Sequence, residues 1–187
     1  SWFKTLQDSI CHSISELEKN KIKFESTTWK RNQNKDEGGG EYRILKDGKI
    51  FDKVGVNFSK VYGKFPKHFQ KQIPGAEKNP KFWASGISLV IHPFSPKIPA
   101  IHMNTRYIVT QKSWFGGGID ITPSDKNSGE SKKIANYFHG ELDKTCDDYK
   151  KGSYKKYKKW CDDYFFLPHR NESRGLGGIF LSLIHIS

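Results

Sequence analysis

Apolar residues at helical spacing open the chain. Within the first 18 residues the apolar positions recur every three or four residues: Trp2, Phe3, Leu6, Ile10, Ile14 and Leu17. This is the spacing that places side chains along one face of an α-helix. The pattern predicts an amphipathic helix over residues 2–18, with His12 off the apolar stripe and therefore in solvent. The same period predicts two further helices, over 130–151 and 153–164.

Runs rich in β-branched and aromatic residues, bounded by Gly, Pro, Asn and Asp, fill most of the chain between the predicted helices. Such runs are typical of β-strands. Asp47-Gly48 is a residue pair that suits a tight hairpin turn, so residues 42–63 are predicted to form two strands about it. The other predicted strands are 22–29, the two arms of a hairpin over 88–107, 114–123 and one that begins within 177–180, while 31–40 and 64–81 are predicted to be connections.

Strands joined by hairpins, with helices grouped apart from them in the sequence, indicate an α+β fold with a mainly antiparallel sheet. At 187 residues the chain is long enough for one domain with a sizeable core. It has no run of about 18 apolar residues, so no membrane-spanning helix is predicted. Its N-terminal residue, Ser1, is not an initiator, so we expect a processed N-terminus.

The predicted hairpin over 88–107 carries polar side chains on runs that otherwise look buried. Strand side chains alternate between two faces, so the polar positions of this hairpin share one face with Val90. With the loop centred near Lys97, the cross-strand neighbours are predicted to be Ser88 with Arg106, Val90 with Asn104 and His92 with His102. The opposite face suits core packing, with Leu89, Ile91, Ile101, Met103 and Thr105. One face is thus predicted to anchor the sheet and the other to form a site.

This polar face has the chemistry of a carboxylate-binding site. The guanidinium of Arg106 matches a carboxylate in two parallel hydrogen bonds, with Asn104 and Ser88 as further donors. The two histidines supply proton transfer near neutral pH or metal ligation. A metal-dependent hydrolase that uses the histidines is therefore an alternative function, with Asp120 and Glu172 as the carboxylate partners it would need. Glycines 116–118 would let a ligand or a second backbone approach closely.

The charge balance suggests a second alternative, a basic nucleic-acid-binding module. The formal net charge is +12, and 27 lysines stand against five arginines. The lysine-rich segment 150–160 contains aromatic residues that could stack on bases. Their spacing instead favours an ordinary amphipathic helix with its lysines in solvent and these side chains inward: Tyr154, Tyr157, Trp160 or Cys161, and Tyr164. The three cysteines, Cys11, Cys146 and Cys161, include no C-x-x-C pair and predict reduced thiols and a cytoplasmic location.

Four long segments, in order along the chain, resemble the oxygen-dependent coproporphyrinogen III oxidase family. They are "GGGEYRILKDGKIFDKVGVNFSKVYG", "GISLVIHPFSPKIPAIHMNTRY", "WFGGGIDITP" and "YKKWCDDYFFLPHRNESRGLGGIF". The resemblance implies a large antiparallel sheet flanked by α-helices on both sides, in a homodimer. It also implies oxidative decarboxylation of two propionates of coproporphyrinogen III to vinyl groups, which gives protoporphyrinogen IX in haem biosynthesis with O₂ as co-substrate and no organic cofactor.

The resemblance also implies roles for individual residues. His102 corresponds to the family's proton donor, and the substrate-binding positions correspond to Ser88, Asn104, Thr105 and Arg106. The histidines that correspond to ligands of a divalent metal in bacterial members are His92, His102, His139 and His169. The residues themselves give the metal little support, because the four lack a close ligand spacing such as H-x-x-x-H. A lone histidine in a helix, such as His139, is more often structural.

The chain departs from the family after Phe180. The family continues with Phe-Asp-Asp, whereas here Ser182 and Leu183 stand at the two aspartate positions. We therefore expect residues 1–180 to be a single but partial domain that lacks the family's C-terminal portion, and 181–187 to be a non-native tail. A carboxylate can accept from pyrrole N–H groups and favour loss of a proton, which serine and leucine cannot do. The chain as written is expected to be inactive on coproporphyrinogen III.

Overall fold

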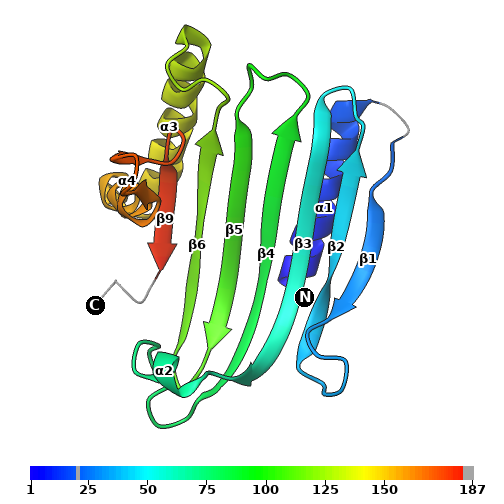
Figure 1. The fold of residues 1–187 in the computed structure, drawn as a ribbon, viewed down its shortest axis with the longest axis vertical. Coiled ribbons are helices and arrows are strands. Elements are labelled where there is room, and N and C mark those ends of the chain that lie inside the picture. The colour runs from blue at the N-terminus through cyan, green and yellow to red at the C-terminus, as the bar shows by residue number, and fades with distance from the viewer. Residues whose placement is uncertain (20–21, 183–187) are drawn as a thin grey trace.

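The computed structural model describes residues 1–19 and 22–182 (Figure 1). Its helices are α1 (Trp2–Glu18), α2 (Lys67–Gln70), α3 (Gly129–Tyr149) and α4 (Ser153–Tyr164). Its strands are β1 (Glu25–Lys30), β2 (Gly38–Lys46), β3 (Phe51–Lys64), β4 (Lys81–Pro93), β5 (Ala100–Val109), β6 (Ser113–Thr122), β7 (Phe166–Leu167), β8 (Glu172–Ser173) and β9 (Gly178–Ser182). The three predicted long helices and the predicted long strands are all confirmed. Most boundaries differ by a few residues, but β4 begins seven residues before the predicted hairpin, at Lys81.

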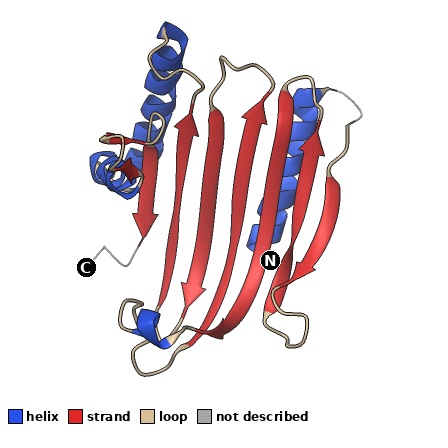
Figure 2. Cartoon of the chain, viewed as in Figure 1, coloured by secondary structure: helices blue, strands red, loops and turns tan. Residues whose placement is uncertain are grey.

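Seven strands form one antiparallel sheet in the order β1-β2-β3-β4-β5-β6-β9. The first six follow the chain order, so the sheet is a meander, in which only the connection between β3 and β4 contains a helix, α2 (Figure 2). Only β9 arrives from a distance, because α3 and α4 intervene before it pairs with β6. The predicted α+β fold with a large antiparallel sheet is confirmed.

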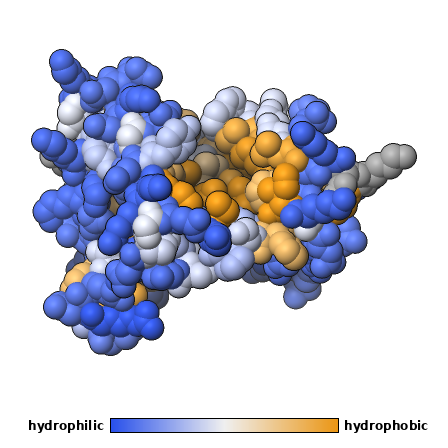
Figure 3. All heavy atoms as spheres, turned by 90° about the horizontal axis from the view of Figure 1, so that it is seen from above, coloured by the Kyte–Doolittle hydropathy of each residue, from blue (hydrophilic) through white to orange (hydrophobic). Residues whose placement is uncertain are grey.

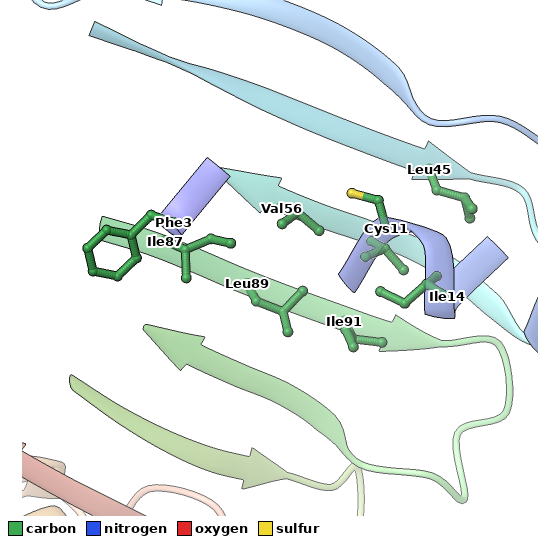
Figure 4. Packing of buried hydrophobic residues seen from close by; sticks show 9 residues of the cluster. Phe3, Cys11, Ile14, Leu45, Val56, Ile87, Leu89 and Ile91 are labelled. Carbon is green, nitrogen blue, oxygen red and sulfur yellow. The ribbon is translucent and has the colours of Figure 1, made fainter. Parts of the chain in front are cut away.

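One face of the sheet carries the hydrophobic core under α1 (Figure 4). The side chains that β2, β3 and β4 contribute alternate with outward-facing ones, as the pleat requires. Helix α1 adds residues spaced by three or four positions, which makes a continuous interface. The buried members of this cluster are Phe3, Cys11, Ile14, Leu45, Val54, Val56, Ile87, Leu89 and Ile91.

The face that α1 buries differs from the predicted stripe. Trp2 and Leu17 were predicted to be inward but are 65% and 56% exposed, whereas Gln7 and Glu18 are buried. Both buried polar side chains bond to the sheet backbone. Gln7 donates to the carbonyl oxygens of Glu41 and Val56, at 3.0 Å each. Hydrogen bonds of this kind offset the cost of burying an amide or a carboxylate. The pattern of apolar residues alone therefore predicts the wrong buried face for α1.

Helix α4 packs on β9 and reaches the opposite face of the sheet, so helices flank the sheet on both sides. Its Tyr157 and Cys161 are buried, as predicted, but Tyr164 is 64% exposed. Two aromatic residues of α3 that follow the helical spacing, Tyr137 and Tyr149, are also in solvent and are more than 70% exposed. These aromatic residues carry a polar hydroxyl, and periodicity does not distinguish a buried tyrosine from an exposed one.

Beyond the end of the α1 interface, the same sheet face has a shallow apolar hollow of about 200 Å³. The apolar side chains that line it are Met103, Phe115, Ile119, Ile179 and Leu181. Seen from above, apolar residues gather in a hollow between hydrophilic flanks (Figure 3). The sheet therefore has an apolar face that α1 covers only in part.

Three segments differ from the predicted connections and tail. The predicted loop 31–40 ends early, because β2 begins at Gly38, and the connection 64–81 contains the short helix α2. Of the segment 181–187, Leu181 and Ser182 extend β9, and the other five residues lie outside the described part of the chain. Within residues 1–19 and 22–182, no helix has the length and apolar character needed to cross a membrane. The three cysteines are buried free thiols.

The β2–β3 turn depends on a carboxylate from α1. Glu18 accepts hydrogen bonds from the backbone N–H groups of Lys49, Ile50 and Phe51, at 2.9, 3.0 and 2.7 Å. Glu18→Gln removes the negative charge and turns an N–H donor toward these donors. We expect it to lower the free energy of unfolding by about 2–3 kcal/mol, measured by denaturant titration.

Glu16→Gln is the matched control, because Glu16 lies on the same helix and is exposed. This substitution is expected to change the free energy of unfolding by less than about 0.5 kcal/mol. Equal unfolding midpoints for the two variants would contradict the role given to Glu18.

Candidate active site

The β4–β5 hairpin has a register two residues away from the predicted one. The observed cross-strand neighbours are Gly86 with Arg106, Ser88 with Asn104 and Val90 with His102. The predicted pairs Ser88 with Arg106, Val90 with Asn104 and His92 with His102 are therefore wrong. The loop is centred one residue earlier than predicted, at Pro96, which moves every pair by two positions. A shift of two preserves the faces, so the predicted sorting of the side chains still holds.

The polar face lines a cavity of about 470 Å³, here called the site cavity. Strands β4 and β5 supply four of the residues proposed from the sequence: Ser88, His102, Asn104 and Arg106. The other wall comes from the end of α4 and the residues after it: Tyr164, Phe165, Arg174 and Phe180. Thr105 also borders the cavity, but its side chain alternates to the opposite face with Met103. Only the backbone of Thr105 is therefore directed to the cavity.

The cavity exists because glycines flank its polar residues. On the polar face, Arg106 lies between Gly86 of β4 and Gly116 of β6, and Asn104 lies beside Gly118. These neighbours have no side chain to fill the space above the sheet. Gly118 also admits β9, because a Cβ there would lie 2.8 Å from the carbonyl oxygen of Ile179. The prediction that glycines 116–118 permit the close approach of a second backbone is confirmed.

Arg106 is the arginine without a partner in the described chain. Arg43, Arg170 and Arg174 each form an ion pair with a carboxylate. Arg31 donates to the carbonyl oxygen of Tyr62. The exposed guanidinium of Arg106 forms no hydrogen bond or ion pair with another described residue. It is free to bind a ligand carboxylate at the mouth of the site cavity.

A buried carboxylate lies beneath the histidine of the cavity. Asp120 of β6 is the cross-strand neighbour of His102 and is 4% exposed. Its Oδ2 accepts a hydrogen bond of 2.9 Å from Nη2 of Arg174 and lies 3.7 Å from Nδ1 of His102. That ring nitrogen and Nε of Arg174 are both buried without a hydrogen-bond partner among the described residues. The three side chains form one cluster, which borders the cavity.

This cluster was not predicted from the sequence as part of the site. Asp120 entered only as a partner for a metal-dependent hydrolase, and Arg174 was not proposed at all. One local signal pointed to Asp120, because it is the single charged residue in an otherwise apolar and glycine-rich strand. A carboxylate in such a strand needs a partner. Nothing local identified that partner, which lies 54 residues further along the chain.

Aromatic rings hold Arg174 and complete the wall. The guanidinium of Arg174 stacks on the ring of Phe165 at 4.0 Å, and Tyr164 stacks on Phe180 with ring centroids 4.5 Å apart. Nearby, burial raises the pKa of the Cys161 thiol to about 12, with the carboxylates of Asp120 and Asp162 adding to the shift. The thiol therefore stays protonated at neutral pH and does not serve as a nucleophile.

A family model described as coproporphyrinogen III oxidase matches residues 1–186. The chain belongs to the coproporphyrinogen III oxidase family. It is 47% identical over 193 aligned residues to proteins named oxygen-dependent coproporphyrinogen-III oxidase from Rickettsia akari (strain Hartford) and Rickettsia bellii (strain RML369-C). A protein of the same name from Rickettsia africae (strain ESF-5) is 46% identical. These alignments cover 99% of this chain and 66% of each relative's length.

The four histidines that the resemblance to bacterial members suggested as metal ligands do not lie together. His92 and His102 share the polar face, with ring centroids 6.4 Å apart, but His92 is not among the residues that line the site cavity. His169 lies exposed in the turn between β7 and β8. Among residues 1–19 and 22–182, no three His, Cys, Asp or Glu side chains are grouped so that they could hold a metal ion.

His139 has no ring nitrogen available for a metal. Nε2 lies 2.8 Å from the carbonyl oxygen of Leu176, which can only accept, so Nε2 donates. In the neutral ring Nδ1 then accepts from the Tyr154 hydroxyl, also 2.8 Å away. Burial raises the pKa of Tyr154, with carboxylates nearby adding to the shift, so its hydroxyl keeps the proton it donates. The arrangement does not fit a four-histidine metal site, and we assign no chemical step to a metal.

The Asp120–Arg174 pair offers a test that needs no substrate. Asp120→Asn and Arg174→Gln are each expected to lower the free energy of unfolding by about 1–3 kcal/mol, because each leaves a charged group without its partner. The double variant is expected to lose less than the sum of the two. A coupling energy of about 1–3 kcal/mol should appear in a double-mutant cycle measured by denaturant unfolding.

The exposed pair Lys159–Asp163 on α4 is the matched control. Lys159→Gln with Asp163→Asn is expected to give a coupling energy of only about 0.3–0.5 kcal/mol, as exposed pairs on a helix do. Additive effects at Asp120 and Arg174 would show that the two groups do not interact in solution.

Proposed function

We propose that the complete protein is an oxygen-dependent coproporphyrinogen III oxidase. The observation that carries the proposal is the guanidinium of Arg106, which has no partner among the described residues and borders a cavity that also contains His102 and the buried Asp120. A binding group for carboxylates therefore lies beside a group that transfers protons. Membership of the coproporphyrinogen III oxidase family and the names of its relatives support the same substrate and oxidant.

The proposed reaction requires both kinds of group. When a propionate becomes a vinyl group, it loses CO₂, one β-hydrogen as a proton, and two electrons. The electrons pass to O₂, which is the co-substrate. The protein must therefore hold the carboxylate in a fixed position, receive or relay a proton, and shield the reduced macrocycle from side reactions.

Ser88, Asn104 and Arg106 are proposed to bind the substrate carboxylates. They lie on adjacent strands of one face, and their glycine neighbours leave space above them. The guanidinium of Arg106 can donate two parallel hydrogen bonds to one carboxylate, and the Ser88 hydroxyl and the Asn104 amide can add one each. Thr105 is proposed to contribute through its backbone only.

His102 is proposed to transfer the proton, with Asp120 holding its ring. Nδ1 of His102 is buried and faces the carboxylate of Asp120, so Nε2 is the nitrogen left for the substrate. A carboxylate behind a histidine favours the tautomer with its proton on Nδ1 and stabilises the charged ring. The separation of 3.7 Å is longer than a hydrogen bond, and we propose that it shortens when substrate fills the cavity.

The aromatic wall is proposed to pack against the pyrrole rings. Tyr164 and Phe180 are stacked on each other at the edge of the cavity and present apolar surface to it. Aromatic surfaces of this kind bind flat apolar groups and exclude water from them. The homodimer and the cytoplasmic location expected from the sequence stay predictions.

The two alternative functions have less support. In the lysine-rich helix α4, Tyr157 is buried, and Lys158 and Lys159 pair with Asp162 and Asp163 one turn away. A nucleic-acid-binding face would keep such groups free. A metal-dependent hydrolase would need a cluster of ligands, which the described residues do not form.

The test of the proposed function is turnover by the full-length protein. Coproporphyrinogen III is supplied without oxygen, O₂ is then admitted, and protoporphyrinogen IX and CO₂ are measured. We expect two CO₂ for each product molecule, no product without O₂, and no turnover of the tetramethyl ester, which lacks free carboxylates. Absence of CO₂ release under oxygen would exclude the proposed function.

Arg106→Lys tests the carboxylate clamp. Lysine keeps the charge but cannot form the two parallel bonds of a guanidinium. Loss of a charged hydrogen bond worth about 1.5–3 kcal/mol is expected to lower kcat/KM by roughly 10- to 150-fold. Arg170→Lys is the control, because Arg170 is exposed in the β7–β8 turn and does not line the site cavity. A kcat/KM for Arg106→Lys equal to that of the control would refute the clamp.

A further inference from the structure

His139 lies outside the site cavity but connects its own helix to α4 and to the segment after α4, which supply one wall of that cavity. It belongs to α3, Tyr154 belongs to the first turn of α4, and Leu176 belongs to the segment 174–178 that leads into β9. The two hydrogen bonds of its ring, both 2.8 Å, join these parts. A histidine placed in this way acts as a tether between two helices and a loop.

The two partners select one tautomer of His139. The carbonyl oxygen of Leu176 can only accept, so Nε2 must carry the proton. Nδ1 then has the lone pair that accepts from the Tyr154 hydroxyl. The neutral ring satisfies both partners at once, and a metal ion could bind either nitrogen only by breaking one of these bonds.

The segment 174–178 is held on its other side by β6. Leu176 N donates to the carbonyl oxygen of Ile121 at 3.0 Å, and Ile121 N donates to the carbonyl oxygen of Gly177 at 3.2 Å. Gly175 has φ +61°, and a Cβ there would lie 2.4 Å from the carbonyl oxygen of Ile121. The segment therefore runs tightly along the end of β6, and His139 closes it from the helix side.

This segment begins with the arginine that pairs with Asp120. The backbone N–H of Arg174 donates to the carbonyl oxygen of Phe165 at 3.0 Å, and its guanidinium reaches Asp120, which faces His102. Leu176 is only two residues from Arg174 in the chain. A change in the position of Leu176 would therefore also move the Arg174–Asp120 pair, which lies beneath His102. Small displacements of such groups can alter a rate strongly without affecting substrate binding.

We propose that His139 is a positioning residue, which holds the segment 174–178 so that Arg174 meets Asp120, and that it is not a metal ligand. The kinetic part of this inference rests on the proposed function. Its structural part rests on the two hydrogen bonds alone, so the two parts can fail separately.

The kinetic test compares His139→Leu with His139→Gln in the full-length protein. Leucine removes both hydrogen bonds. Glutamine can donate to Leu176 and accept from Tyr154, but it is a poor ligand for a divalent metal of the first transition row. We expect His139→Leu to lower kcat about 10-fold or more, with KM within about threefold of wild type, because the carboxylate clamp on β4 and β5 is unchanged. His139→Gln is expected to restore kcat to within about threefold of wild type.

The matched control is His12→Leu, the same substitution at an exposed position of α1, which is expected to leave kcat and KM unchanged. Equal losses for His139→Gln and His139→Leu would indicate a ligand and overturn the proposal. A kcat for His139→Leu equal to that of the control would also overturn it.

If His139→Leu does not fold, as judged by thermal unfolding, Tyr154→Phe replaces it. That variant removes only one hydroxyl and is expected to lower kcat about threefold, and an unchanged kcat would overturn the proposal.

An activity-independent readout uses the ¹⁵N shifts of the His139 imidazole, assigned by difference from His139→Gln. We expect the neutral tautomer with its proton on Nε2, and no change in these shifts when Zn²⁺ is added. A Zn²⁺-dependent shift of His139 would overturn the proposal whether or not the protein turns over coproporphyrinogen III. Unchanged shifts in a protein without turnover would support the tether and count against the proposed function only.

Discussion

The alternation of side chains along β4, β5 and β6 is the constraint on which the rest of the structure depends. Every second residue must face the apolar side of the sheet, which α1 covers in part, so the residues between them must face the other way. In β4, Ile87, Leu89 and Ile91 take the first set of positions, and the cavity residues take the second. The core and the candidate site are thus two sides of one pleated layer. A shift of one residue would destroy both, whereas the observed shift of two changes the neighbours and preserves each face.

The space and the charge of the site come from different kinds of residue. Gly86, Gly116 and Gly118 leave the sheet bare around Arg106 and Asn104, so a ligand can reach the backbone level. The two arginines of the cavity differ in whether they have a carboxylate partner, and this difference suggests different roles. Arg174 is committed to a buried carboxylate and supports the proposed proton-transfer group, while Arg106 has no partner in the described chain. The charge of Arg174 is neutralised by Asp120, whereas the guanidinium of Arg106 can form two hydrogen bonds to a carboxylate of the substrate.

Polar side chains that bond to backbone groups join the helices to the sheet and to the segment that leads into β9. Gln7 and Glu18 do so for α1, and His139 does so for α3. Each of these polar side chains occupies a buried or half-buried position where the periodicity of the helix would suggest an apolar one. Each also fixes the orientation of its helix, because a hydrogen bond is directional whereas apolar packing is not. This explains why the buried face of α1 is rotated from the predicted stripe. It also explains how a helix outside the cavity can influence the position of groups inside it.

The long helices, the long strands and the polar face of the candidate site were predicted from the sequence alone. The period of apolar residues predicted α1, α3, α4 and the strands of the meander. The alternation of side chains along the strands placed four polar residues on one face: Ser88, His102, Asn104 and Arg106. Both patterns could be recognised because they involve residues that are near neighbours in the chain. Only the tertiary structure decided the hairpin register, the burial of Gln7 and Glu18, and the pairing of Asp120 with Arg174 across 54 residues. These features depend on the conformation of one loop and on contacts between distant segments, and no local pattern of residues encodes which distant groups will meet when the helices pack on the sheet.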